Sequence, residues 1–279
     1  MKRRTLLAGS LALSLSLLLS ACGGTAASSQ ASSAPASSAA ASSEASGESV
    51  QLMVFAAASL TETLNQIAEQ YKTVAPNVEL VFNFDSSGTL KTQIEEGADC
   101  DLFLSAAQKQ MNALQDEDLI NTGTRVDLLE NKVVLAVPEG NPADIQSFED
   151  IGTDKCKLVA LGNEDVPVGS YSIEILTNLG ILDELESSNK ITYGSNVKEV
   201  TTQVKEAAAD CGIVYDSHAY SAGLVTVDEA TADESGQVIY PAALTASTAH
   251  AEEAQAFLDY LTTDDAAAIF ESVGFAMVK

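Results

Sequence analysis

The sequence predicts an α/β fold. From Val50 onward, short apolar runs alternate with amphipathic segments whose apolar residues recur at helical spacing. Glycine or proline ends several of these segments, as at Gly97, Pro138 and Gly180. Strands that alternate with helices form mostly parallel sheets with helices on both faces. The roughly 230 residues after Val50 are enough for one large domain or two smaller lobes.

The expected elements follow one another without long gaps. The expected strands are 51–55, 78–84, 101–104, 132–137, 157–161, 191–193, 212–215 and 238–243. The expected helices are 60–72, 89–96, 108–115, 170–179, 197–209, 251–261 and 265–272. In parallel sheets, ligands bind beyond the carboxyl ends of the strands and beside helix N-termini. A ligand site is therefore expected at the strand-to-helix junctions.

The N-terminus has the three parts of an export signal over residues 1–21: a short basic region, an apolar stretch over 6–19 and small residues before a Cys. The apolar stretch is too short and too rich in Ser for a good transmembrane helix. The run LSAC that ends at Cys22 resembles the lipobox of bacterial lipoproteins, in which that Cys carries the lipid. Residues 22–49 are mostly Gly, Ser and Ala, which predicts a flexible lipid-anchored linker.

The charge balance excludes several partners. The chain has 40 acidic and 14 basic residues and a formal net charge of −26. Such a chain does not bind nucleic acid or an anionic membrane surface through a basic patch. Arg125 is the one arginine beyond the signal, so an arginine clamp on a ligand is not expected.

Cysteine and histidine residues do not predict an enzyme. Cys100, Cys156 and Cys211 have no CxxC spacing, which argues against a zinc or redox site. Either Cys156 and Cys211 form a disulfide or the thiols are free and buried. His218 and His250 are expected on the surface or at helix caps. No G-x-S-x-G motif is present, so a serine hydrolase is not expected, and neither is a metal site or a cofactor.

Four junctions between a strand and a helix are rich in small and hydroxyl residues: 54–62, 84–90, 166–171 and 194–199. At the first, Ser59 and Glu62 have the spacing of a capping box. The unpaired N–H groups of a helix N-terminus bind oxyanions without any cation. A buried strand also ends at Tyr215, which offers a phenol. These features predict a site for an anion held by dipoles.

The same segments resemble the molybdate-binding proteins of ABC importers. The motifs that carry the resemblance are FAAASLT at 55–61, SSGTL at 86–90, QIEEGADCDLFLS at 93–105, VPVG at 166–169, GIVY at 212–215 and IFESVGFAMV at 269–278. They follow one another in the same order along most of the chain after Val50.

The resemblance implies a two-lobed, periplasmic-binding-protein-like fold of type II, each lobe a mostly parallel sheet flanked by helices. The lobes would be 50–134 plus 240–279 and 135–239, with hinge crossings near 132–138 and 238–243. It also implies the ligand groups: hydroxyls of Ser59 and Ser87, backbone N–H groups of Val168 and Val197, and the phenol of Tyr215.

Together with the lipobox at Cys22, the resemblance implies a monomeric binding protein that is lipid-anchored on the outer face of the cell membrane. It would capture molybdate, and tungstate of nearly the same size, and pass it to the permease and ATPase subunits of an ABC importer. The alternative ligand is another tetrahedral oxyanion such as sulfate. Asp85 departs from a donor-only site. Either it points away from the ligand or caps a turn, or it faces the ligand, where it would favour a protonated oxyanion such as hydrogen phosphate.

Overall fold

The structure, a computed structural model, describes residues 49–278. The predicted signal over 1–21, Cys22 and the predicted linker up to residue 48 lie outside the described residues. Within 49–278, no helix is both long enough and apolar enough to cross a bilayer.

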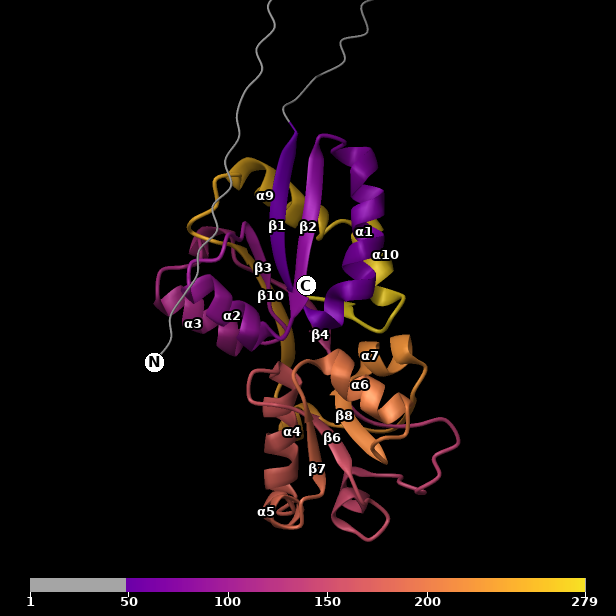
Figure 1. Cartoon of the computed structure of the whole chain (residues 1–279). Helices are drawn as coiled ribbons and strands as arrows, with labels where there is room; N and C mark the ends of the chain where they lie inside the picture. Colours follow the sequence, from indigo (N-terminus) through magenta and orange to yellow (C-terminus); the bar gives the residue numbers. More distant parts are fainter. Residues whose placement is uncertain (1–48, 279) are drawn as a thin grey trace, which may run out of the picture. The chain divides into compact units, whose positions relative to one another are not determined.

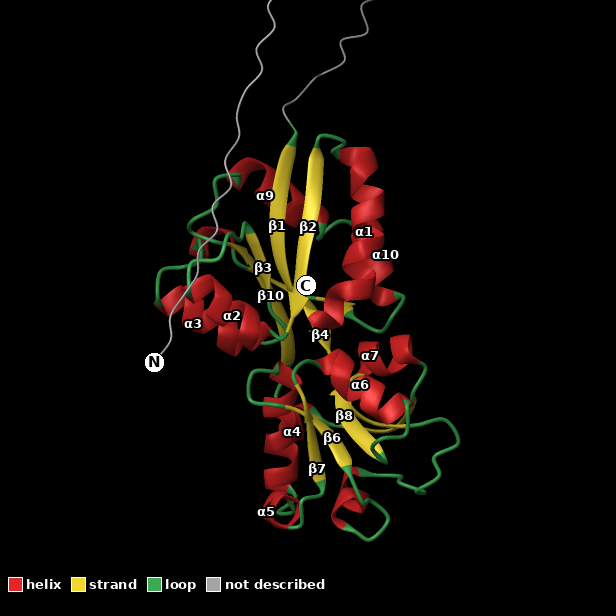
Figure 2. Ribbon diagram, in the orientation of Figure 1, coloured by secondary structure: helices red, strands yellow, loops and turns green. Residues whose placement is uncertain are grey.

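The described strands form two sheets (Figure 2). A six-stranded sheet has the order β11-β4-β10-β3-β1-β2, and a five-stranded sheet has the order β7-β6-β8-β5-β9. The strands of the first sheet are β1 Val50–Ala57, β2 Val78–Asp85, β3 Leu102–Leu104, β4 Val126–Asn131, β10 Val238–Leu244 and β11 Ala276–Met277. Those of the second sheet are β5 Val133–Val137, β6 Val159–Gly162, β7 Ile191–Gly194, β8 Cys211–Tyr215 and β9 Val225–Glu229. We call each sheet with its helices a lobe.

Helices connect most of the strands. Those of the first lobe are α1 Thr61–Val74, α2 Ser87–Glu95, α3 Gln108–Asp116, α9 Ala251–Tyr260 and α10 Asp264–Glu271. Those of the second lobe are α4 Pro167–Asn178, α5 Leu182–Ser187, α6 Val197–Lys205, α7 Asp216–Ala222 and α8 Ala232–Ser235. Short 3-10 turns lie at η1 Ala58–Leu60, η2 Thr122–Thr124 and η3 Phe148–Gly152.

Alternation along β1 decides how the first sheet is covered. Leu52, Val54 and Ala56 belong to one buried cluster with residues of α1, α9 and α10. Phe55 belongs to a second cluster with residues of α2 and α3. Successive side chains of a strand point to opposite faces, so these helices cover the two faces of the sheet. The sequence-based prediction that helices cover both faces of the sheet is confirmed for this sheet.

Parallel pairing is concentrated at the strands that lead into helices. β1 pairs in parallel with β2 and β3, and β6 pairs in parallel with β7 and β8. β10 and β5 run antiparallel to their neighbours. The carboxyl ends of the parallel strands therefore meet at one edge of each sheet, where helices begin. The α/β fold class with two lobes is confirmed.

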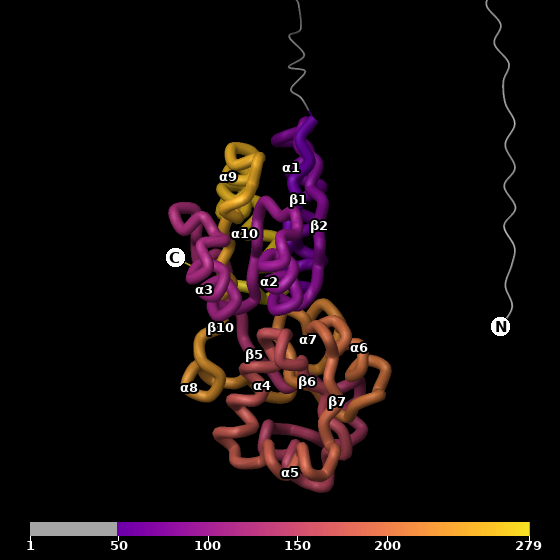
Figure 3. Tube along the Cα trace, turned by 60° about the vertical axis from the view of Figure 1, so that its left-hand side comes forward, coloured from indigo at the N-terminus to yellow at the C-terminus, as the bar shows by residue number. Residues whose placement is uncertain are grey.

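The chain passes between the sheets twice. β4 ends at Asn131 and β5 begins at Val133, so the first passage takes a single residue, Lys132. The return passage runs from the end of β9, through α8, to the start of β10 at Val238. Figures 1 and 3 show the helices α1, α2, α3, α9 and α10 grouped around the first sheet and α4 to α8 around the second.

Several short elements were not expected from the sequence: β4, α5, α7, α8, β9 and β11. They are brief, and the strands β9 and β11 have few buried side chains, so they carry little hydrophobic periodicity. The helix expected over 197–209 ends earlier, at Lys205, because Ala207 adopts a positive φ of 53°.

Candidate functional site

The predicted ligand groups converge on one cavity between the lobes. It is lined by Ala57, Ala58, Ser59, Asp85, Ser86, Ser87, Ala106, Val166, Pro167, Val197 and Tyr215. Four of the five predicted residues are in this lining. The fifth, Val168, is fully buried directly after Pro167. The cavity is about 10 Å³, close to the room that one water molecule needs.

Ser59 is buried in the 3-10 turn that joins β1 to α1. Its Oγ accepts a hydrogen bond from Tyr240 Oη at 3.1 Å, which leaves its own proton free to donate. The predicted capping box is wrong: α1 has Leu60 as its N-cap with no side-chain cap bond. Because the 3-10 turn continues straight into the helix, Ser59 is released from capping and faces the cavity.

Ser87 is the first residue of α2 and is fully buried. Its Oγ accepts from the Ala106 N–H at 2.9 Å, which orients the hydroxyl. The preceding residue, Ser86, is the N-cap and accepts from the Thr89 N–H at 3.0 Å. The two serines therefore have different roles. The Ser86 hydroxyl caps the N-terminus of α2, and the Ser87 hydroxyl keeps its proton for another acceptor.

Two backbone donors lie in the second lobe. Val168 is the second residue of α4, and Val197 is the first residue of α6. The first N–H groups of a helix have no acceptor within the helix, and the helix dipole makes that end partly positive. Asn196 caps α6 as expected, accepting from the Glu199 N–H at 3.1 Å. Both positions offer N–H groups of the kind that bind oxyanions.

Tyr215 ends β8, where its side chain is almost completely buried. Its Oη donates to the Ala106 carbonyl of the other lobe at 3.3 Å. Burial raises the pKa of Tyr215 well above its usual value. The phenol therefore keeps its proton and acts as a donor.

Sequence reasoning missed the residues that support these donors. Tyr240 on β10 is fully buried, and its ring meets that of Tyr215 edge-on at 5.6 Å. The Asn131 side-chain amide donates to Ser217 Oγ at 2.8 Å and approaches Tyr240 Oη at 3.3 Å. Neither residue lies in a motif, and the contact between Tyr240 and Ser59 spans 181 positions. No local signal in the sequence points to it.

The two lobes touch around the cavity. The Gly88 N–H of α2 donates to the Asp165 carbonyl at 2.9 Å. A Cβ at Gly88 would lie 2.4 Å from that carbonyl oxygen, so glycine permits the close approach. Lys198 of α6 pairs with Glu62 of α1 at 2.7 Å. Both contacts join the two lobes.

Asp85 is the acidic residue in the cavity lining. One of its carboxylate oxygens accepts from the Ser86 N–H at 2.7 Å. Of the two alternatives for this residue, the turn cap is the one with a hydrogen bond in the structure. Its side chain is half-buried at the end of β2, so its negative charge remains close to the site.

His218 is not on the surface as predicted. It is buried in α7, where its Nδ1 has no hydrogen-bond partner, and burial lowers the pKa of the imidazole to about 4. The polar run Asp216-Ser217-His218 favours an exposed position. The seven-residue helix that it starts instead packs on the second sheet. His250 is the N-cap residue of α9, as expected for a helix-opening position.

A larger cleft of about 530 Å³ lies beside the α4 N-terminus, lined by Lys109, Gly162, Asn163, Glu164, Gly169, Ser170, Ile173 and Tyr193. It is larger, but none of the five predicted ligand residues lines it. The small cavity is the better candidate because buried hydroxyls and helix N-termini meet there. Among residues 49–278, no group of His, Cys, Asp and Glu side chains could hold a metal ion.

The arrangement defines a class of protein: two lobes that enclose a small, donor-lined site between them. The chain belongs to the family of bacterial extracellular solute-binding proteins, whose profile matches residues 52–276. This is a family of transport proteins that bind solutes and are not enzymes, and it acts outside the cytoplasm.

Individual relatives agree with the family. A putative ABC transporter substrate-binding lipoprotein, YvgL of Bacillus subtilis, is 36% identical over 230 residues, covering 82% of this chain and 87% of the relative. The molybdate-binding protein ModA of Haemophilus influenzae is 36% identical over 233 residues, covering 82% and 91%. The solved substrate-binding domain of a putative molybdenum ABC transporter from Clostridium difficile is 37% identical with a TM-score of 0.64, covering 83% and 100%.

Proposed function

We propose that this chain captures molybdate, and also tungstate, between its two lobes and delivers the anion to the permease and ATPase subunits of an ABC importer. The observation that carries the proposal is the convergence of hydroxyls and helix N-termini on one buried cavity. The relatives named for molybdate and molybdenum support the same ligand.

The proposed ligand groups are Ser59, Ser87, Val168, Val197 and Tyr215. Each offers a proton, and none needs to accept one. Molybdate is a dianion without a proton at neutral pH, so a set of donors matches all four of its oxygens. A hydrogen bond to a charged group contributes about 1.5–3 kcal/mol.

Selectivity among tetrahedral oxyanions would come from protonation and size. Hydrogen phosphate carries a proton that requires an acceptor, and Asp85 is the nearest carboxylate to supply one. Because one carboxylate oxygen of Asp85 already accepts from the Ser86 N–H, Asp85 would cap the turn and would not serve as an acceptor for the ligand. Sulfate has shorter bonds than molybdate, so donors spaced for the larger anion would lie too far from its oxygens.

The proposed binding motion of the monomer is an opening and closing of the two lobes. An anion with four oxygens needs more room than one water molecule, so the donors would move slightly outward around it. Tyr215 would then exchange the Ala106 carbonyl for an oxygen of the anion. Contacts from both lobes to one ligand would favour closure.

The proposed tether is a lipid on Cys22, followed by the Ser- and Ala-rich linker. It would keep the binding protein on the outer face of the cell membrane, close to the importer. The B. subtilis relative named as a lipoprotein supports this arrangement.

Thermal unfolding with added anions tests the proposed ligand. A ligand at 100 times its Kd stabilises the folded state by about 2.7 kcal/mol, which raises Tm by about 5–10 °C for a chain of this size. Molybdate and tungstate at micromolar levels should give this shift, while sulfate and phosphate should not. A shift with sulfate alone would establish the alternative ligand, and a shift with phosphate would indicate that Asp85 faces the anion.

Labelling with a fatty-acid analogue tests the proposed tether. The wild-type chain should incorporate the label and sediment with membranes, and Cys22→Ser should do neither. Cys100→Ser is the matched control and should behave as wild type. Equal membrane association of the Cys22→Ser protein would refute the lipid anchor.

A further inference from the structure

We propose that Cys156 and Cys211 form an intramolecular disulfide in the exported chain. Their Sγ atoms lie 3.7 Å apart, and both side chains are fully buried in the second lobe. Neither residue takes part in the ligand site, so the inference goes beyond the proposed function and does not depend on the identity of the ligand.

The backbone on both sides of the pair is fixed by a clamp. One carboxylate oxygen of Asp210 accepts from the Lys157 N–H at 2.7 Å and from the Leu158 N–H at 3.0 Å. The Asp210 N–H in turn donates to the Leu158 carbonyl at 2.9 Å. Immediately beyond the clamp, Val159 of β6 is in parallel register with Cys211 of β8. The two cysteines are thus the direct neighbours of residues that the fold holds together.

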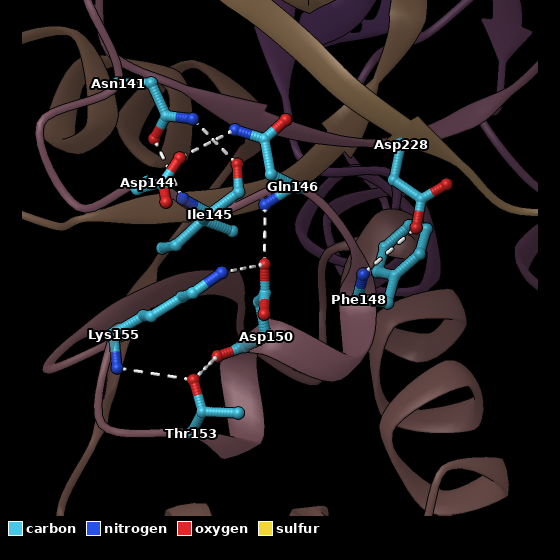
Figure 4. Close-up of polar contacts among 9 residues, drawn as sticks. All are labelled: Asn141, Asp144, Ile145, Gln146, Phe148, Asp150, Thr153, Lys155 and Asp228. Atoms are coloured by element: carbon cyan, nitrogen blue, oxygen red, sulfur yellow. Dashed lines mark hydrogen bonds and ion pairs between the residues drawn. The ribbon is translucent and has the colours of Figure 1, made fainter.

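The segment that leads to Cys156 is also well ordered by polar contacts (Figure 4). Asp150 accepts from the Gln146 N–H at 2.8 Å and pairs with Lys155 Nζ at 2.9 Å. The Thr153 hydroxyl donates to the Asp150 carbonyl at 2.7 Å. The Lys155 N–H, one residue before Cys156, donates to the Thr153 Oγ at 3.3 Å, so the backbone next to this cysteine is also held by a hydrogen bond.

The third cysteine of the described region is placed differently. Cys100 lies in the first lobe, just before β3, and its Sγ donates to the Leu102 carbonyl at 3.4 Å. Burial raises the pKa of its thiol to about 12, which keeps it protonated and unreactive. Disulfides persist outside the cytoplasm. We therefore expect Cys156 and Cys211 to be linked there and Cys100 to remain a thiol.

The chemistry is a thiol–disulfide exchange with an external disulfide, either a small molecule or an oxidoreductase. The Cys156 thiolate attacks the external disulfide, forms a mixed disulfide and releases one thiolate. Cys211 then attacks the Cys156 sulfur and releases the second. The two protein thiols lose two electrons and two protons, and the external disulfide gains them as two thiols.

Because both sulfurs are buried in the folded chain, the exchange belongs to the folding phase after export. The pair is separated by 55 positions, so the bond would close a long loop in the unfolded chain. Closing such a loop removes conformational freedom from the unfolded state and raises the stability of the fold.

Thiol trapping followed by peptide mass spectrometry tests the proposal. The full chain is isolated from the cell envelope in acid, denatured and alkylated without reductant. A linked pair of peptides that contain Cys156 and Cys211 is expected, together with an alkylated Cys100. Alkylation of both Cys156 and Cys211 in this sample would overturn the proposal. Neither outcome depends on the anion, so the result is separate from that of the proposed function.

Thermal unfolding with and without dithiothreitol provides a second measurement. Reduction should lower Tm by about 5–15 °C in the wild-type protein and equally in Cys100→Ser, the matched control. The double variant Cys156→Ala/Cys211→Ala should not respond to the reductant. An unchanged Tm of the wild-type protein on reduction would count against the disulfide.

Discussion

At the scale of single residues, the candidate site consists of hydrogen-bond donors whose neighbours orient them without using their protons. Ser59 and Ser87 each accept one hydrogen bond from within the protein, from Tyr240 and from the Ala106 N–H respectively. A hydroxyl that accepts from one partner is oriented and keeps its own proton for another. Burial raises the pKa of Tyr215, so that residue is also a donor at every physiological pH.

Removing the phenol oxygen of Tyr215 should weaken binding of the proposed anion. Tyr215→Phe loses one charge-assisted hydrogen bond, so the Kd for molybdate should rise about tenfold or more. Isothermal titration calorimetry measures this directly, which matters because the chain has no tryptophan. Tyr220→Phe, at an exposed position, is the control and should bind as wild type. An unchanged Kd for Tyr215→Phe would remove this residue from the site.

Protonation of His218 should make the fold less stable in acid. The unfolded histidine binds a proton near its ordinary pKa of 6.5, but in the folded protein the pKa is lowered to about 4 by burial. The unfolded state therefore binds more protons in this window, and the free energy of unfolding falls as pH drops. The loss from this group reaches roughly 3 kcal/mol. The nearby charges Glu62 and Lys198 act on the imidazole in opposite directions.

Denaturant unfolding of His218→Leu at pH 7 and pH 4.5 measures this contribution. Leucine has a similar size and no titrating group, so the variant should lose about 2–3 kcal/mol less stability than wild type between the two pH values. Carboxylates that titrate in the same range affect both proteins alike. Parallel pH dependence of the two proteins would contradict the role assigned to His218.

At the scale of elements, the proposed anion site would rely on helix N-termini, where other anion sites use arginine side chains. α2, α4 and α6 begin beside the cavity, and each follows a short junction from a strand. Their N–H groups and dipoles make a locally positive region in a chain with a formal net charge of −26. The position of each helix start is therefore as important as any side chain.

Gly169 sets the position of the α4 N-terminus. A Cβ at this residue would lie 2.4 Å from the carbonyl oxygens of both Gly162 and Asn163. Gly169→Ala should therefore push α4 away from β6, misplace the Val168 N–H, and cost about 1–3 kcal/mol of stability. The Kd for molybdate should rise at least tenfold by calorimetry. Ser170→Ala, at the exposed next position, is the control, and equal affinities of the two variants would disprove the positioning role.

At the scale of the whole molecule, the two lobes meet around a small cavity. The backbone bond between Gly88 and Asp165, the Tyr215 phenol and the pair between Glu62 and Lys198 all join the lobes. In the proposed binding motion, opening would separate these contacts. The ligand's own bonds to both lobes would then decide how long the closed form lasts.

The ion pair between Glu62 and Lys198 should contribute little to closure. Its side chains are 49% and 42% exposed, and exposed pairs are worth about 0–1 kcal/mol. Glu62→Gln should therefore raise the Kd for molybdate less than about fivefold at physiological salt. Glu69→Gln, which breaks an exposed pair within α1, is the control. A loss of more than tenfold for Glu62→Gln alone would show that the pair is a main closing contact.

The sequence by itself determined the α/β class, the order of the main elements and the positions of the candidate donors. These properties are encoded locally: hydrophobic periodicity defines strands and helices, and small or hydroxyl residues mark the junctions. Ser87, Val197 and Tyr215 could be singled out because each stands at the end of a recognisable element.

The tertiary structure alone decided which distant residues meet. Tyr240 donates a hydrogen bond to Ser59, and Ser59 does not form the expected capping box. His218 is buried, and the sulfurs of Cys156 and Cys211 lie close together. These contacts join residues of different elements, and most of them lie far apart in the sequence. They depend on sheet order, strand register and the packing of helices onto sheets, which no local pattern specifies. The sequence therefore predicts the donors, and the fold determines what orients them.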